Sequence, residues 1–263
     1  MGEKGVNQRR IRLGEARYNK QGTLMQIIEY NNANDIAVKF DNGYDTIVYH
    51  NTYKNFKNGL IKDPYHPSLY GVGITGAKYQ SRINYEMTPE YSIWIGMMAR
   101  CYKPNHKKHK SYHECKVCQD WLLFENFYEW LHSQDNFNKC INENYNSWEI
   151  DKDILFKNNK IYSPSTCCLV PHIVNSLFIK RKDYRGSLPI GVVMHNGKYL
   201  AQCHNSNNYI YLGVYNTIAE AFQAYKHYKE NLIKQVAQEE YAKGNITKQC
   251  YDAMMDYIVE ITD

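Results

Sequence analysis

The chain has 263 residues, of which 43% are hydrophobic and 22% charged, a balance typical of folded protein that excludes wholesale disorder. This length suits two or three small domains. The net charge of +5 is too small to indicate a nucleic-acid partner by itself, so such a partner has to be inferred from local patches. No run approaches the roughly 18 apolar residues of a membrane helix, and no apolar signal segment opens the chain, so we expect a cytoplasmic protein without a membrane span.

Three alternating runs near the amino terminus predict a small antiparallel β domain at residues 1–63. The runs are Thr23–Tyr30, Asp35–Phe40 and Asp45–Tyr49, with Asn- and Gly-containing turns between them. Basic residues before the first run would add non-specific phosphate contacts; they are Arg9, Arg10, Arg12 and Arg17. Gly and Pro then punctuate the chain, and we expect a linker at 64–87.

Two helices are predicted next, over Thr88–Arg100 and near Trp121–Leu131. Thr88 can cap the first helix, Pro89 suits its first turn, and apolar residues follow at helical spacing. A basic loop separates the helices and contains Lys107, Lys108 and Lys110. Such a run is usually solvated surface. The alternative is that it contacts phosphate, and the choice between the two depends on the residues around it.

Residues 148–178 follow the order strand, turn, strand, helix. The first strand, 148–155, carries Asp151, the second strand spans 162–170, and the helix that starts near Pro171 carries Asn175. Both side chains would converge on one cation, and oxygen ligands suit magnesium or manganese. Alternation along the strand would turn Asp153 to the face of Asp151 as a second acidic group, unless these residues only form a polar strand edge.

Several spaced anchors in the segment 88–183 resemble the HNH, or ββα-metal, endonucleases of phages and mobile introns. The anchors are Tyr91, Trp94, Met97, Arg100, Cys118, Trp121, Phe124, Phe127, Ile150–Asp153, and Tyr162 to Pro164 leading to Asn175. The resemblance implies that Asp151 and Asn175 hold a metal at the scissile phosphate and that the residue after the aspartate activates water. That residue is commonly His in the family, whereas this chain has Lys152.

Lys152 is a poor general base, because a lysine is protonated at neutral pH unless burial or neighbouring cations depress its pKa. We interpret it as a cation that clamps phosphate. The candidates to replace it as the base are Asp153, His113 and His172, and the residues alone do not rank them.

The cysteines allow a second kind of metal site. A structural zinc would take Cys115, Cys118 and one of Cys167 and Cys168, since neighbours on a strand face opposite ways. Packing as buried free thiols is the favoured alternative.

The segment 184–263 predicts three strands and a helix. Pro189–Cys203 forms two strands around an Asn196-Gly197 turn, and Asn208–Tyr215 forms the third. Thr217 would cap a helix that covers one face of the sheet. The remainder, from Asn231, predicts further helix with a break near Gly244.

This order resembles the APETALA2 DNA-binding domain, which also occurs in phage homing endonucleases. The matching residues are Gly191, Val192, Lys198, Tyr199, Ala201, Tyr211–Gly213, Thr217, Glu220, Ala221, Ala224 and Tyr225. The resemblance implies that the uncovered strand face enters the major groove of DNA. The candidate contacts are His195, Lys198, Gln202, His204, Asn205 and Tyr209.

Together these patterns predict an α+β chain with a small amino-terminal β unit, a central ββα-metal module with flanking helices, and a carboxy-terminal three-stranded sheet plus helix. The predicted function is a phage-type homing endonuclease, a metal-dependent hydrolase that binds duplex DNA in the host cytoplasm. One alternative is a catalytically inactive DNA-binding phage protein or inhibitor of host defence. Another is that the former nuclease surface binds a host protein or a small molecule, and a homodimer is also left open.

Overall fold

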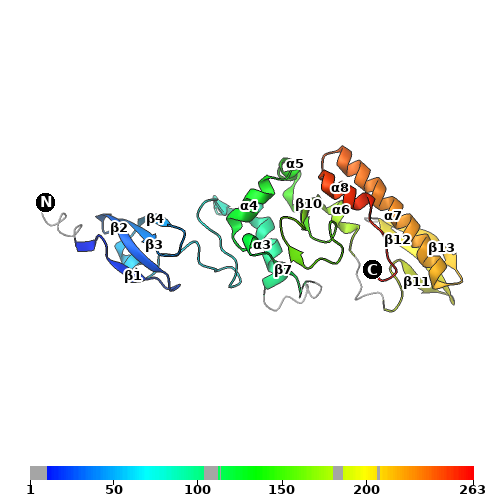
Figure 1. Ribbon diagram of the computed structural model, residues 1–263, viewed down its shortest axis with the longest axis horizontal. Helices are drawn as coiled ribbons and strands as arrows, with labels where there is room; N and C mark the ends of the chain where they lie inside the picture. The colour runs from blue at the N-terminus through cyan, green and yellow to red at the C-terminus, as the bar shows by residue number, and fades with distance from the viewer. Residues whose placement is uncertain (1–10, 104–111, 113, 180–185, 206–207) are drawn as a thin grey trace. The chain divides into compact units, whose positions relative to one another are not determined.

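A computed structural model describes residues 11–103, 112, 114–179, 186–205 and 208–263. The chain is α+β, as predicted (Figure 1). It forms two compact units, one of residues 1–91, 102–105 and 119–128, and the other of 92–101, 106–118 and 129–263. Within the described ranges, no helix is both long enough and apolar enough to span a membrane.

The amino-terminal β unit is confirmed. Its sheet has the order β1-β2-β3-β4 with antiparallel neighbours, and the elements are β1 (Ala16–Tyr18), β2 (Leu24–Asn32), β3 (Asp35–Phe40), β4 (Ile47–Asn51) and α2 (Tyr53–Lys57). Alternate residues such as Ile27, Val38 and Phe40 are buried and pack with Phe56 of α2. The three-residue β1 is too short for its alternation to be recognised.

Two of the arginines predicted to contact phosphate take part in packing of this unit. The guanidinium of Arg12 lies 3.7 Å from the ring centroid of Tyr53 and pairs with Glu15 at 3.6 Å. Arg17 lies in β1, with its guanidinium 5.8 Å from the ring of Phe56. Arg9 and Arg10 lie outside the described residues.

The segment 64–87 is anchored by a buried carboxylate. Glu125 accepts hydrogen bonds from the backbone N–H groups of Ala77 and Lys78 and from the hydroxyl of Tyr65. Gly76 has φ +76, and a Cβ at this position would lie 2.2 Å from Glu125 Oε1. A short hairpin of β5 (Arg82–Ile83) and β6 (Glu86–Met87) follows. This part of the chain is therefore folded onto a specific side chain.

The two helices predicted for the next segment are confirmed, although they begin and end at other residues than predicted. The elements are α3 (Pro89–Tyr102), β7 (Lys116–Val117), α4 (Phe124–His132) and α5 (Phe137–Glu143). Trp121 lies in a 3-10 turn before α4 rather than in the helix. Trp94, Met97, Phe124 and Phe127 are fully buried, so these anchors are core residues.

The central module contains a strand pair followed by a short helix. β8 (Trp148–Asp151) pairs antiparallel with β10 (Cys168–Pro171), and α6 (His172–Ser176) follows directly. The prediction that the first strand continues to residue 155 is wrong. It ends at Asp151 because Oδ1 of this residue accepts the N–H groups of Asp153 at 2.7 Å and Ile154 at 2.8 Å, which turns the backbone.

The second predicted strand, 162–170, is divided. β9 (Ile161–Tyr162) pairs with β7 instead of β8, and a turn at Ser163 separates it from β10. Pro171 is the last residue of β10 and the N-cap of α6, rather than a residue of its first turn.

The carboxy-terminal sheet and helix are confirmed. β11 (Val192–His195), β12 (Lys198–Asn205) and β13 (Asn208–Tyr215) form an antiparallel sheet, with Asn196 and Gly197 at positive φ in the first turn. Thr217 and Glu220 form a reciprocal capping box at the start of α7 (Ile218–Ala242), and Gly244 at φ +70 separates it from α8 (Lys248–Met255).

Helix α7 covers one face of the sheet (Figure 1). Phe222 and Tyr225 of α7 pack in one core with Ala201 of β12. The same core includes Val170 and Val174 of the strand-helix module. The segments 88–183 and 184–263 therefore share apolar packing across the predicted domain boundary.

Candidate functional site

Two acidic residues of β8 face the same way, and helix α6 bonds to the first of them. Strand alternation puts Glu149 and Asp151 on one face of the β8–β10 pair. Glu149 Oε1 lies 2.6 Å from Nδ1 of His172, and the amide nitrogen of Asn175 donates to Glu149 Oε2. The spacing of three residues puts His172 and Asn175 on one face of α6. One carboxylate therefore fixes two side chains of the helix.

Asp151 is a partly buried carboxylate with one oxygen in use. Its Oδ1 receives the two backbone N–H groups that end β8, whereas Oδ2 has no hydrogen bond to a described residue. Burial raises the pKa of Asp151 to about 6, although the N–H groups of Ile154 and Asp153 act in the opposite direction. At neutral pH the group is mostly ionised and can offer Oδ2 to a cation.

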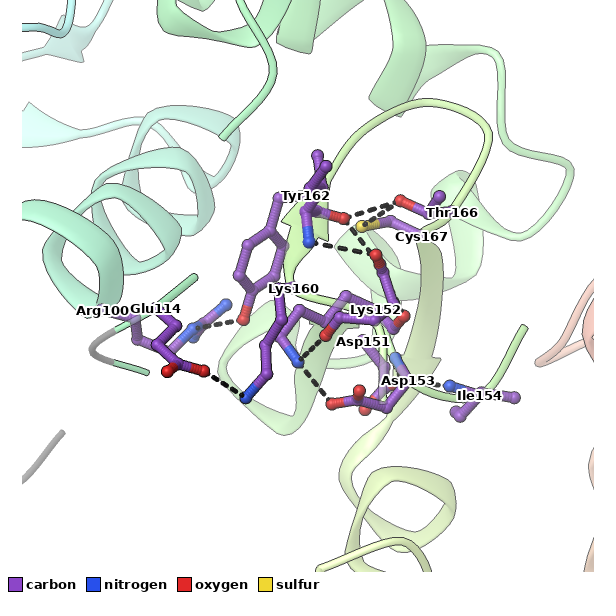
Figure 2. Close-up of polar contacts among 12 residues, drawn as sticks. Arg100, Glu114, Asp151, Lys152, Asp153, Ile154, Lys160, Tyr162, Thr166 and Cys167 are labelled. Atoms are coloured by element: carbon purple, nitrogen blue, oxygen red, sulfur yellow. Dashed lines mark hydrogen bonds and ion pairs between the residues drawn. The ribbon is translucent and has the colours of Figure 1, made fainter. Parts of the chain in front are cut away.

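Lys152 is buried and fully engaged. It is 6% exposed, and its ammonium donates to Asp153 Oδ2 at 2.6 Å and to the carbonyl of Asn159 at 2.7 Å (Figure 2). Burial lowers the pKa of Lys152, but the hydrogen bond to Asp153 and the charge of that residue outweigh it, so the pKa is raised. The amine is therefore protonated, as expected, and its contacts tie it to the protein.

The remaining candidates for the base differ in their surroundings. Asp153 does not continue the strand face of Asp151; it follows the turn and pairs with Lys152. His113 lies outside the described residues. His172 is 64% exposed, and Glu149 holds its Nδ1. With the proton on Nδ1, its Nε2 is an acceptor open to water.

The donor chemistry fits a hard divalent cation. Asn175 donates through its nitrogen, so Oδ1, the atom that would bind a metal, has no hydrogen bond to a described residue, as is true of Asp151 Oδ2. Within the described ranges, no three His, Cys, Asp or Glu side chains form a metal-binding group, and no hydrogen bond joins Asp151 to Asn175. Magnesium needs only one or two carboxylates when water and phosphate complete its shell.

Glu149 was missed from the sequence, although a signal existed. It stands two residues before Asp151 on a predicted strand, so alternation assigns it to the same face. Asp153, the next alternating position, does not share this face because the strand ends at Asp151.

The cysteines considered for zinc are reduced and packed. No disulfide joins any of the eight cysteines, all of which lie in the described residues, and Cys115, Cys167 and Cys168 are buried. Burial raises the pKa of the Cys115 thiol and raises that of Cys167 to about 12. The neighbouring Cys250 thiol of α8, together with burial, raises the pKa of Cys168. The zinc site stays a prediction.

The strand register gathers the predicted DNA contacts on one sheet face. His195 pairs with Lys198, Gln202 with Tyr211, and His204 with Tyr209. These residues alternate with Ala201 and Cys203, which belong to the core beneath α7, so they lie on the face that α7 leaves uncovered. Asn205 ends β12, and its side chain lies outside the described ones, as do Lys107, Lys108 and Lys110 of the basic loop.

This open face is aromatic with an apolar middle. Val193, Leu200 and Val214 form one cross-strand row, and the rings of His204 and Tyr209 meet edge to face at 5.6 Å. Tyr211, which the sequence analysis did not select, is 61% exposed on the same face. Exposed aromatic rings on a sheet are suited to contact with flat or apolar groups such as thymine methyls.

Comparison with family models, curated proteins and solved structures finds no match to this chain.

Proposed function

We propose that the chain is a metal-dependent endonuclease that binds duplex DNA. The observation that carries this proposal is the β8–β10 pair followed by α6, in which Asp151 Oδ2 and Asn175 Oδ1 make no hydrogen bond to a described residue while the other polar atom of each side chain is fixed. The fixed partner atoms restrict the rotation of both side chains, which suits metal ligands held by neighbouring groups. Asp151 and Asn175 would hold Mg²⁺ or Mn²⁺, and the ion would stabilise charge on the phosphate.

His172 takes the role of general base in this proposal. Glu149 orients its ring, and its exposed Nε2 accepts a proton from the water that attacks phosphorus as a P–O ester bond breaks. The proton is thus taken by a residue on the helix, and Lys152 with its raised pKa is not required to act as a base.

The open face of the carboxy-terminal sheet supplies the proposed contact to duplex DNA. Its support is the common orientation of five residues selected from the sequence and the absence of α7 from that side; these residues are His195, Lys198, Gln202, His204 and Tyr209. Replacing Tyr211 by Ala should weaken duplex binding. The control Tyr241→Ala removes an exposed ring from α7 and should not.

Plasmid cleavage tests catalysis. Supercoiled plasmid is incubated with the purified protein and Mg²⁺ or Mn²⁺, and we expect nicking that Asn175→Ala and His172→Gln abolish. His50→Gln is the matched control, because His50 also contacts a carboxylate, that of Asp35 at 3.2 Å, in the amino-terminal unit. Absence of nicking by a folded wild-type protein with either ion contradicts the proposed activity.

A second candidate is a DNA-binding protein without catalysis. The observation that favours it is Lys152, which stands where the resemblance implies a base and is neutralised by Asp153. This candidate predicts salt-sensitive duplex binding that survives Asp151→Ala, with no cleavage by the wild type.

A further inference from the structure

Arg100 is a cation near the candidate site that forms no salt bridge to an acidic residue among the described residues. It lies in the last turn of α3, and its Nε donates to the hydroxyl of Tyr162 at 3.2 Å. Its guanidinium carbon lies 5.5 Å from the ring centroid of Tyr162 and 5.9 Å from that of Tyr112. Glu149 acts on Arg100 only through its charge, without a salt bridge. Partly buried charges are usually paired in direct contact, so a cation whose direct contacts in the described residues are two phenol rings suggests an anionic ligand.

The outer nitrogens of Arg100 are available to such a ligand. Neither Nη1 nor Nη2 makes a hydrogen bond to a described residue, and neither is sealed from solvent. The single bond through Nε and the flanking rings restrict the guanidinium plane. The two Nη groups therefore form a fixed fork of donors, the geometry that matches two oxygens of a phosphate.

Comparison with Lys152 shows why Arg100 is the better phosphate ligand. The ammonium of Lys152 also lies 5.9 Å from the Tyr112 ring, but Asp153 and the Asn159 carbonyl already bind it. Tyr112 thus connects Arg100 to the ion pair that follows Asp151 in the chain. Figure 2 draws Arg100 and its bond to Tyr162 together with the ion pair of Lys152 and Asp153.

We propose that Arg100 binds a phosphodiester of duplex DNA through Nη1 and Nη2 and holds it beside Asp151. This inference rests on the proposed DNA binding and assigns the phosphate contact, expected of Lys152 from the sequence, to a residue 52 positions earlier in the chain. Tyr162 and Tyr112 are positioning residues, since they fix the guanidinium.

The test is the salt dependence of duplex binding by the full chain, measured by fluorescence anisotropy in EDTA so that neither metal nor cleavage contributes. Loss of one phosphate contact lowers the slope of log affinity against log salt by about 0.9. We expect this change for Arg100→Gln, with affinity reduced about tenfold, as for the loss of a charged hydrogen bond. Arg82→Gln is the control, because Arg82 is exposed and its Nη1 donates only to the carbonyl of Tyr85.

Equal slopes for wild type and Arg100→Gln would overturn the role of Arg100 and leave DNA binding intact. An equal loss in Arg100→Gln and Arg82→Gln would also overturn it, since the effect would then be general charge. If the wild type binds no duplex, the proposed function fails and this inference fails with it.

A measurement on the wild-type protein covers the case in which Arg100→Gln does not fold. Phenylglyoxal modification, mapped by mass spectrometry, should be slowed at Arg100 by bound duplex and unchanged at Arg82. Equal modification of Arg100 with and without duplex contradicts the proposal.

Discussion

Replacing Asp151 by Asn should stabilise the fold while removing the proposed metal ligand. The carboxylate is partly buried, and burial raises its pKa from 3.8 to about 6. An asparagine keeps an oxygen in the position of Oδ1, so the N–H groups of Asp153 and Ile154 retain an acceptor. The change therefore removes a destabilising charge and leaves the turn after β8 in place.

The magnitude follows from the difference between the two pKa values. Each pKa unit corresponds to about 1.4 kcal/mol, so ionising Asp151 in the folded state costs at most about 3 kcal/mol at neutral pH. The folded pKa lies above the unfolded one, so the folded state binds the proton more tightly. The cost is present above about pH 6 and disappears as the pH falls toward about 4.

Thermal and urea unfolding of wild type and Asp151→Asn between pH 4 and pH 8 measures this effect. We expect a gain of about 2–3 kcal/mol at pH 7.5, equivalent to several degrees in Tm, that shrinks toward zero near pH 4. Asp153→Asn is the matched control. It should be destabilising, because it leaves the buried ammonium of Lys152 without its carboxylate. A variant Asp151→Asn that is less stable than wild type at pH 7.5, or a gain independent of pH, would refute the reasoning.

Three other outcomes follow from the same structure. Gly76→Ala should lower the free energy of unfolding by about 2 kcal/mol more than Gly71→Ala, since both have similar φ but only Gly76 would meet Glu125; urea unfolding compares them. Lys152→Met should lower the free energy of unfolding by about 1–3 kcal/mol, because Asp153 and the Asn159 carbonyl lose their donor, and should leave duplex affinity unchanged, because the amine is bound inside the protein. Mn²⁺ at 100 times its Kd should stabilise wild type by about 2.7 kcal/mol, but not Asp151→Asn, as measured by calorimetry.

The carboxy-terminal fold was predictable because its determinants are local. The Asn196-Gly197 turn, the alternation around it and the Thr217–Glu220 capping box each lie within a few residues. The face that carries the predicted contacts then follows from strand pairing and from which side α7 covers. A local pattern thus fixed both the elements and the orientation of their side chains.

The central site was less predictable because side chains there compete with the backbone or bind across the sequence. Asp151 ends its own strand by accepting two N–H groups, which moved Asp153 off the predicted face. Lys152 donates a hydrogen bond to the carbonyl of Asn159, and Arg100 donates one to Tyr162, which is 62 residues away in the chain. Contacts of this kind depend on the tertiary fold and leave no periodic signal.

The lysine at position 152, where the resemblance implies a histidine, therefore bears less on the proposed catalysis than the sequence alone indicates. The proposals divide among three residues the roles that the resemblance would concentrate near Asp151. Lys152 is neutralised within the protein, Arg100 carries a positive charge without a salt bridge among the described residues, and His172 has a carboxylate that orients it and an exposed nitrogen. If His172→Gln keeps full nicking activity while Asn175→Ala abolishes it, the base is not on α6, and the metal site stands without it. If both variants lose activity and His50→Gln does not, the proton acceptor is supplied by the helix rather than by the strand.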